Sequence, residues 1–307
     1  MDVQVMLRLQ GMLFLLTLAG VYARKRNIIP PDTRSRLSDL LIEVILPMNI
    51  ISSFDIQLEG EVLKRAALAL ALAFLAQGFC YLASRLLYRR AEPARQAVLR
   101  YATVVSNAGF MGLPIVRAAM GTEAALYASI ALIPIRIFMW SAGLSLFTKT
   151  DAKSALFKLL VHPCNIAVLI GFVVLLIPGK LPEFLSGAIT SIGNCATAVS
   201  MLIIGGFLAD IRIRSVLSLD ILFYSAVRLL LLPLAVLGML SLFHVDGILV
   251  GVLVLLTAMP AGSTTAILAD KYGGDAPFAS TAIFVSTFLS LVTIPVFPLL
   301  TRSVYGG

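Results

Sequence analysis

The stretch Asn107–Val116, NAGFMGLPIV, lies in the middle of a hydrophobic segment but has a composition that a membrane-spanning helix avoids. It contains an asparagine, two glycines and a proline. Proline lacks a backbone N–H and clashes with the preceding turn, and glycine has no side chain that would favour the helical conformation. In hydrocarbon, irregular backbone is tolerated only where it is buried in protein or lines a cavity. The stretch therefore predicts a helix that is broken beside a cavity.

A second break of the same kind is predicted at Met259–Thr265, MPAGSTT, within another apolar segment. Pro260 interrupts this helix by the same mechanism. Paired broken helices in corresponding parts of a chain are the best sequence indication of the binding site of a secondary transporter. We therefore expect both breaks to contribute to one site.

The composition is that of an integral membrane protein. Of the 307 residues, 59% are hydrophobic and 13% are charged, whereas soluble domains carry roughly 25% charged residues. The whole chain, 1–307, is expected to form one membrane domain without a separate soluble domain. The net charge of +8 comes from basic residues that flank apolar segments, as topology signals do, which disfavours nucleic-acid binding. The three cysteines and two histidines have no metal-ligand spacing, so no metal or cofactor is expected.

The apolar segments predict ten membrane spans. We place them at roughly 5–23, 36–55, 62–88, 95–120, 123–147, 160–178, 185–209, 216–243, 246–271 and 276–301. Sixteen Lys and Arg residues lie near the loops after odd-numbered spans and four near the loops after even-numbered spans. Because basic loops stay in the cytoplasm, both termini should face outward and the central loop around Lys153 should be cytoplasmic.

Two short matches indicate an internal repeat. Gly121–Ser129 aligns with Gly273–Thr281 without a gap, and Ile50–Phe54 aligns with Ile203–Phe207. Together with the paired breaks they predict two repeats of five spans each. The expected repeats are 1–152 and 153–307. Five is an odd number, so the second copy enters the membrane from the opposite side, and the repeat is inverted about a pseudo-two-fold axis in the membrane plane.

The residues around the two breaks resemble those of the auxin efflux carrier family, in particular its short bacterial members. The resemblance covers nearly the whole chain. It rests most specifically on Asn107, Gly112, Pro114, Gly121, Glu123, Ala124 and Ala125 in the first half and on Lys271, Tyr272, Asp275, Ser280, Thr281, Ala282 and Pro295 in the second.

The resemblance implies an all-helical fold of ten spans in two inverted repeats. Spans one, two, six and seven would form a scaffold, and the others a transport domain in which the broken spans four and nine cross. It also implies the transport of organic anions. The chain lacks the long hydrophilic central loop of plant members, and it has Ser263 and Thr264 but no asparagine near Pro260. A small organic anion is therefore a better fit than auxin.

The chemistry of a broken helix suits an anion, because the N-terminal end of a half-helix carries roughly half a positive charge. Asn107 can bind substrate or satisfy the freed backbone groups, and both roles stay open. Arg136 offers a planar fork to a carboxylate or forms a structural ion pair, and Trp140 lies one turn further along the same helix face. The candidate substrate-binding residues are Asn107, Gly109, Gly112, Pro114, Arg136, Trp140, Pro260, Gly262, Ser263, Thr264 and Ser52. Glu43 and Arg228 are candidates for an ion pair or for coupling. Glu43 could take up a proton during transport if burial raises its pKa, and Arg228 could also contact the substrate.

We therefore expect a secondary carrier that moves a mono- or dicarboxylate across the cytoplasmic membrane by alternating access. An enzyme is not expected, because Asp275 has no second intramembrane aspartate to face and no serine-hydrolase or zinc-protease motif occurs. An anion channel or a non-transporting sensor is the alternative. The expected partners are the anion, the lipid bilayer and, through the scaffold side, a second copy of the chain.

Overall fold

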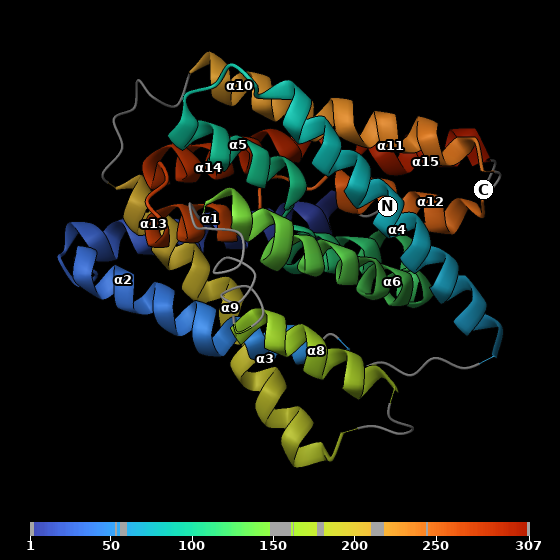
Figure 1. The fold of residues 1–307 in the computed structure, drawn as a ribbon, viewed down its shortest axis with the longest axis horizontal. Coiled ribbons are helices and arrows are strands. Elements are labelled where there is room, and N and C mark those ends of the chain that lie inside the picture. The colour runs from blue at the N-terminus through green and yellow to red at the C-terminus, as the bar shows by residue number, and fades with distance from the viewer. Residues whose placement is uncertain are drawn as a thin grey trace.

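The computed structural model describes residues 3–52, 54–55, 60–147, 161, 163–176, 181–209, 218–243 and 245–305. Within these ranges every regular element is a helix (Figure 1). The central loop around Lys153, the expected boundary between the repeats at 152 and 153, and both histidines lie outside the described residues.

The helices follow the order of the predicted spans. The first half contains α1 (Val3–Lys25), α2 (Pro31–Leu40), η1 (Leu41–Ile45), α3 (Leu46–Ser52), α4 (Gly60–Leu87), α5 (Pro93–Val104), η2 (Ala108–Gly112), α6 (Leu113–Phe138), η3 (Met139–Gly143) and η4 (Leu144–Leu146). The second contains α8 (Pro163–Leu176), α9 (Glu183–Leu208), α10 (Leu219–Ala226), η6 (Val227–Leu231), α11 (Leu232–Ser241), α12 (Gly247–Thr257), α13 (Thr264–Lys271), α14 (Ala276–Thr293) and α15 (Val296–Tyr305). Gly121, with φ 91°, separates two straight parts of α6, close to the predicted boundary between spans four and five.

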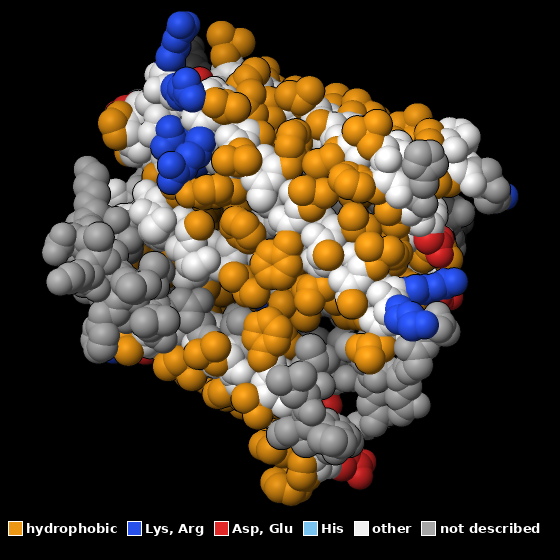
Figure 2. All heavy atoms as spheres, turned by 45° about the vertical axis from the view of Figure 1, so that its right-hand side comes forward, with side chains coloured by type: hydrophobic (Ala, Val, Ile, Leu, Met, Phe, Trp, Pro, Cys, Tyr) orange, Lys and Arg blue, Asp and Glu red, His pale blue; other side chains and the backbone are white. Residues whose placement is uncertain are grey.

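Five helical stretches in the described part of the chain are long and apolar enough to cross a membrane. They are Leu63–Leu87, Glu123–Leu146, Glu183–Leu208, Leu219–Ser241 and Ala276–Thr293. In Figure 2, apolar side chains cover the middle of the visible face, and Lys and Arg side chains gather towards its edges. This is the pattern of a surface that contacts lipid, so the chain is a multi-pass membrane protein.

Both predicted helix breaks are present. α5 ends at Val104 before η2 begins at Ala108, and α12 ends at Thr257 before α13 begins at Thr264. The first break is shorter than the sequence suggests, because η2 runs directly into α6 and the helix continues through Pro114. The irregular backbone is therefore confined to residues 105–107.

A wide π-helical turn precedes three of the prolines. η1, η2 and η6 each end two residues before a proline, namely Pro47, Pro114 and Pro233. A proline cannot donate to the carbonyl four residues back, and its ring clashes with that carbonyl. The wider turn moves the carbonyl away, so each helix bends and continues rather than ending.

The helices pack in two groups. In the first, α9 contacts α1 and α3, and α3 contacts α8. The backbones of α1 and α9 approach so closely that a Cβ atom on Gly20 would lie 2.4 Å from the carbonyl oxygen of Leu202. In the second, α4 contacts α5 and α6, α6 contacts α12, and α14 contacts α10 and α13. In Figure 1, α3 and α8 lie at the opposite edge of the molecule from α10 and α11.

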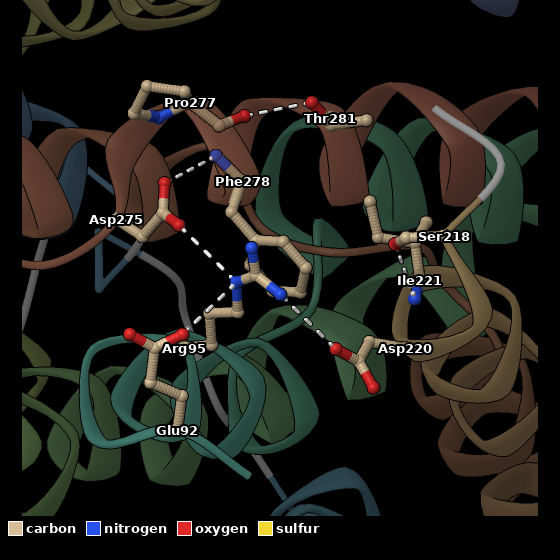
Figure 3. A network of polar contacts seen from close by, with 9 residues as sticks. All are labelled: Glu92, Arg95, Ser218, Asp220, Ile221, Asp275, Pro277, Phe278 and Thr281. Atoms are coloured by element: carbon tan, nitrogen blue, oxygen red, sulfur yellow. Dashed lines mark hydrogen bonds and ion pairs between the residues drawn. The ribbon is translucent and has the colours of Figure 1, made fainter. Parts of the chain in front are cut away.

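A single arginine joins the starts of three helices in the second group (Figure 3). Arg95, in the first turn of α5, lies 3.6 Å from Asp220 of α10 and 3.6 Å from Asp275, the residue that caps α14. Its guanidinium also lies over the ring of Phe278 at 5.2 Å. These contacts hold the ends of α5, α10 and α14 together at one edge of the molecule.

Candidate functional site

The two helix breaks pair with each other. The backbone N–H of Asn107 donates to the carbonyl of Pro260 at 2.8 Å, and the N–H of Gly262 donates to the carbonyl of Val105 at 3.1 Å. Ser106 and Ala261 thereby form an antiparallel bridge. Unpaired backbone groups are costly inside a membrane, and here each break provides hydrogen-bond partners for backbone groups of the other. The main chain therefore performs some of the backbone repair that the sequence could assign to the Asn107 side chain.

A cavity lies beside this bridge. Its volume is about 50 Å³, and it is lined by Leu46, Asn49, Ile50, Ser106, Asn107, Gly109, Leu132, Ile135, Arg136, Met139, Trp140, Gly262, Ser263 and Thr264. Seven of the eleven candidate substrate-binding residues are in this lining. They are Asn107, Gly109, Arg136, Trp140, Gly262, Ser263 and Thr264.

In the cavity lining, one residue from each break has a buried polar atom without a hydrogen-bond partner among the described residues. Asn107 is only 3% exposed, and its Oδ1 has no hydrogen-bond partner among the described residues. The same holds for the hydroxyl of Ser263. A buried polar atom without a partner costs about 1–3 kcal/mol. The Ser263 hydroxyl can donate to an acceptor on a ligand, whereas Oδ1 of Asn107 only accepts, so Asn107 would reach a carboxylate through its Nδ2.

The other polar groups of the lining already have partners. The hydroxyl of Thr264 bonds to that of Tyr101 at 3.0 Å, and the hydroxyl of Ser106 donates to the carbonyl of Leu256 at 3.1 Å. Arg136 is 8% exposed, and Trp140, in the next turn, is buried. Arg136 is the only charged residue in the described lining.

Four candidate residues lie outside the lining. The hydroxyl of Ser52 donates to the carbonyl of Asn49 at 2.9 Å, within the last turn of α3. Gly112 faces α12, where an added Cβ would lie 2.9 Å from the side chain of Leu256. Pro114 begins α6, and Pro260 contributes its carbonyl to the bridge. Gly112, Pro114 and Pro260 thus lie at or next to the breaks, and Ser52 lies at the end of α3.

The two candidates for an ion pair or coupling occupy different surroundings. Glu43 is exposed and lies 3.5 Å from Lys271, which also pairs with Asp39 at 2.8 Å. The hypothesis of a buried proton on Glu43 is therefore not supported by its position. Arg228 is only 2% exposed and donates to two backbone carbonyls, those of Met259 and Thr103.

Sequence reasoning did not identify Asn49 as part of the site. Asn49 lines the cavity from α3, and its Nδ2 donates to the carbonyl of Gly193 in α9 at 3.2 Å. The signal was a polar residue two positions after Pro47, in a segment otherwise rich in isoleucine and leucine. Leu46, Ile50, Leu132, Ile135 and Met139 supply apolar walls that a pattern of charges and breaks does not reveal.

A second cavity, of about 450 Å³, lies where α12 begins and α15 ends, beside Asp246, Arg302 and Tyr305. It is larger, but neither break contributes to it. The combination of paired breaks and unsatisfied polar atoms places the candidate site in the smaller cavity.

Two interrupted apolar helices that meet beside a small cavity with a few polar groups in its lining are typical of membrane transport proteins. The comparisons agree with this class. The model of the membrane transport protein family matches residues 11–156 and 151–298, and the chain belongs to that family. The resemblance to auxin efflux carriers is thereby confirmed. A similar protein is an uncharacterized transporter of Methanothermobacter thermautotrophicus, which is 25% identical over 285 residues, 91% of this chain and 93% of the relative.

Proposed function

We propose that the protein is a secondary carrier that moves a small organic anion, a mono- or dicarboxylate, across the cell membrane by alternating access. The observation that carries the proposal is the cavity where the two breaks meet. The N-termini of η2 and α13 lie at this cavity, and the N-terminus of a helix favours negative charge. The Nδ2 of Asn107 and the hydroxyl of Ser263 can donate hydrogen bonds, and Arg136 offers a fork that fits a carboxylate.

The size of the cavity supports a small substrate. One water occupies roughly 10–15 Å³ on this measure, so a cavity of about 50 Å³ has room for about three to five waters. That is the size of a carboxylic acid with a few carbon atoms. The apolar walls from α3 and α6 match a short carbon chain between its polar ends.

The proposal includes the ten-span inverted repeat and the division into scaffold and transport domain. α1, α2, α3, α8 and α9 would form the scaffold, and the remaining helices would move. Leu46, Asn49 and Ile50 line the cavity from the scaffold side, and the other lining residues belong to the moving side. A substrate bound between the two parts would become accessible to each side of the membrane in turn. Both termini would face outward.

A ligand screen on the purified protein tests the substrate class. A ligand that binds the folded state raises the melting temperature according to its concentration relative to its Kd. We expect small mono- or dicarboxylates to raise it, and amides of the same carbon skeleton to have no effect. Arg136→Ala should lose the response, and Arg65→Ala, which removes an exposed arginine of α4, should keep it. Stabilisation by amines or by neutral amides instead would contradict the proposal.

The alternatives make different predictions for transport. A channel would show uptake that does not saturate and no exchange of internal for external anion. A sensor would bind the anion and transport nothing. Neither has a structural observation in its favour beyond those that the carrier already explains.

A further inference from the structure

Arg228 is a buried charge in the middle of an apolar helical stretch. It lies in η6, within Leu219–Ser241, and its side chain is among the largest that are fully enclosed. Within the described part of the chain it forms no ion pair with a carboxylate. An arginine at the centre of a membrane helix costs at least about 2.5–3.5 kcal/mol on insertion scales. Its surroundings must therefore compensate for the charge.

The compensation comes from the two helix breaks. Nε of Arg228 donates to the carbonyl of Met259 at 3.0 Å, and Nη1 donates to the carbonyl of Thr103 at 2.7 Å. Thr103 lies in the last turn of α5, and Met259 follows the end of α12. In an unbroken helix the N–H of Asn107 would bond to Thr103, but here it bonds to Pro260. The breaks have freed both carbonyls that Arg228 binds.

The neighbouring carbonyls of α5 are capped as well. Tyr224, one turn before Arg228, donates its hydroxyl to the carbonyl of Ala102 at 3.0 Å. Gln77 of α4 donates to the carbonyl of Val104 at 2.6 Å. Arg228 is thus the charged member of a set of side chains that satisfies the C-terminal end of this half-helix.

The bridge between the breaks separates two kinds of helix end. The half-helices that begin there, η2 and α13, start at the cavity. The half-helices that end there, α5 and α12, direct freed carbonyls to Arg228, which does not line the cavity. C-terminal ends carry a partial negative charge. In transporters with broken helices, such carbonyls commonly hold the coupling cation.

We propose that the guanidinium of Arg228 takes the place of a coupling cation at the ends of α5 and α12, so that the protein binds its anion without sodium. The structural part does not depend on the carrier function, whereas the statement about anion binding rests on the proposed function. Nε and Nη1 of Arg228 both donate to backbone carbonyls of the breaks. Arg228 therefore positions the paired breaks and does not contact the substrate.

A comparison of salts tests the proposal on the wild-type protein. Melting temperature and anion affinity should be the same in sodium, potassium and choline chloride at equal ionic strength. A rise in either quantity that is specific for sodium would show that a separate cation site exists, and it would overturn the proposal.

Chemical rescue tests the role of the charge. Arg228→Ala should lower the melting temperature measured without any anion, and low millimolar guanidinium should restore it. Urea has the same planar shape without the charge and should not. Arg65→Ala, the control, should respond to neither compound. Arg228→Ala with wild-type stability, or equal rescue by urea, would contradict the proposal.

Two further variants cover the case in which Arg228→Ala does not fold. Arg228→Lys keeps the charge with a single donor group, and Arg228→Gln keeps a donor without the charge. The lysine variant should melt at the higher temperature and bind the anion more tightly, by about ten-fold. Equal melting temperatures of the lysine and glutamine variants would show that Arg228 does not act through its charge, and would overturn the proposal. If the melting results hold but no carboxylate binds, the carrier proposal fails and the role of Arg228 stands.

Discussion

At the scale of the residue, the site depends on side chains that the backbone leaves available. Asn107 has its main-chain N–H bonded to Pro260 across the bridge, so its side chain need not repair the break. On the other break, Gly262 makes the main-chain bond to Val105, and the neighbouring Ser263 has a buried hydroxyl without a partner among the described residues. An empty site with unsatisfied polar atoms is less stable than a filled one, and this difference favours ligand binding.

Asn107→Ala should weaken binding of the anion by about ten-fold, because the hydrogen bond that Nδ2 would donate to the charged ligand is lost. The melting temperature without ligand should stay the same or rise, since the change removes an unsatisfied acceptor. Isothermal titration and thermal unfolding measure the two effects. Ser52→Ala is the matched control outside the cavity. A large loss of stability without a loss of affinity would show that Asn107 has a structural role only.

Arg136→Lys should lower affinity by about ten- to a hundred-fold, because lysine keeps the charge but loses the fork that matches a carboxylate. Arg136→Ala should lower it further, with the protein still inserted in the membrane. Equal binding by the wild type and both variants would mean that Arg136 stabilises the fold and does not contact the anion.

At the scale of the element, the sequence predicted that two helices break, because proline and glycine act through local backbone chemistry. It did not predict where the first break ends, since the π-helical turn η2 lets the helix continue through Pro114. The bridge between Ser106 and Ala261 and the position of Asn49 depend on contacts between distant segments. Such contacts leave no periodic signal in one sequence. Seven candidates reached the cavity because they lie beside the breaks or on the apolar helix that faces them.

The contact between α1 and α9 gives a prediction with an internal control. Gly205→Ala would place a Cβ atom 2.1 Å from the carbonyl oxygen of Thr17, whereas Gly187 of the same helix has open space around it. Alanine favours a helix over glycine by roughly 0.5–1 kcal/mol, so Gly187→Ala should be neutral or stabilising. Gly205→Ala should destabilise by about 1–3 kcal/mol through overpacking. Thermal unfolding in detergent measures both, and equal behaviour would contradict the close packing.

At the scale of the whole molecule, ion pairs connect the two groups of helices. Arg34 lies 3.9 Å from Asp270, and Lys271 pairs with Asp39 and Glu43, so α2 and η1 contact the end of α13. The Arg95 network, in contrast, joins α5, α10 and α14 within one group. The first set of contacts would break if the groups move relative to each other, and the second would persist.

Lys271→Gln and Asp39→Asn should therefore alter the rate of anion exchange. Exposed pairs contribute only about 0.2–1 kcal/mol, so each change should stay within about five-fold. The double variant should resemble Lys271→Gln alone, because that change already removes the pair with Asp39. Effects that simply multiply would show that the two residues act independently.

The orientation of the chain in the membrane follows from its charges. The central loop around Lys153, which is outside the described residues, should be cytoplasmic. A cysteine placed at position 153 should react with a membrane-impermeant reagent only after cells are opened. Labelling in intact cells would reverse the assigned orientation.

The central claim is that a small carboxylate binds where the breaks meet and is carried across the membrane. Counterflow in proteoliposomes tests it most directly, with the carboxylate chosen by the ligand screen inside and a labelled trace outside. We predict saturable accumulation of label that requires internal substrate, is weakened by Asn107→Ala and Arg136→Lys, and is unchanged by Arg65→Ala. Flux that does not saturate, or accumulation unaffected by the two cavity variants, would contradict it.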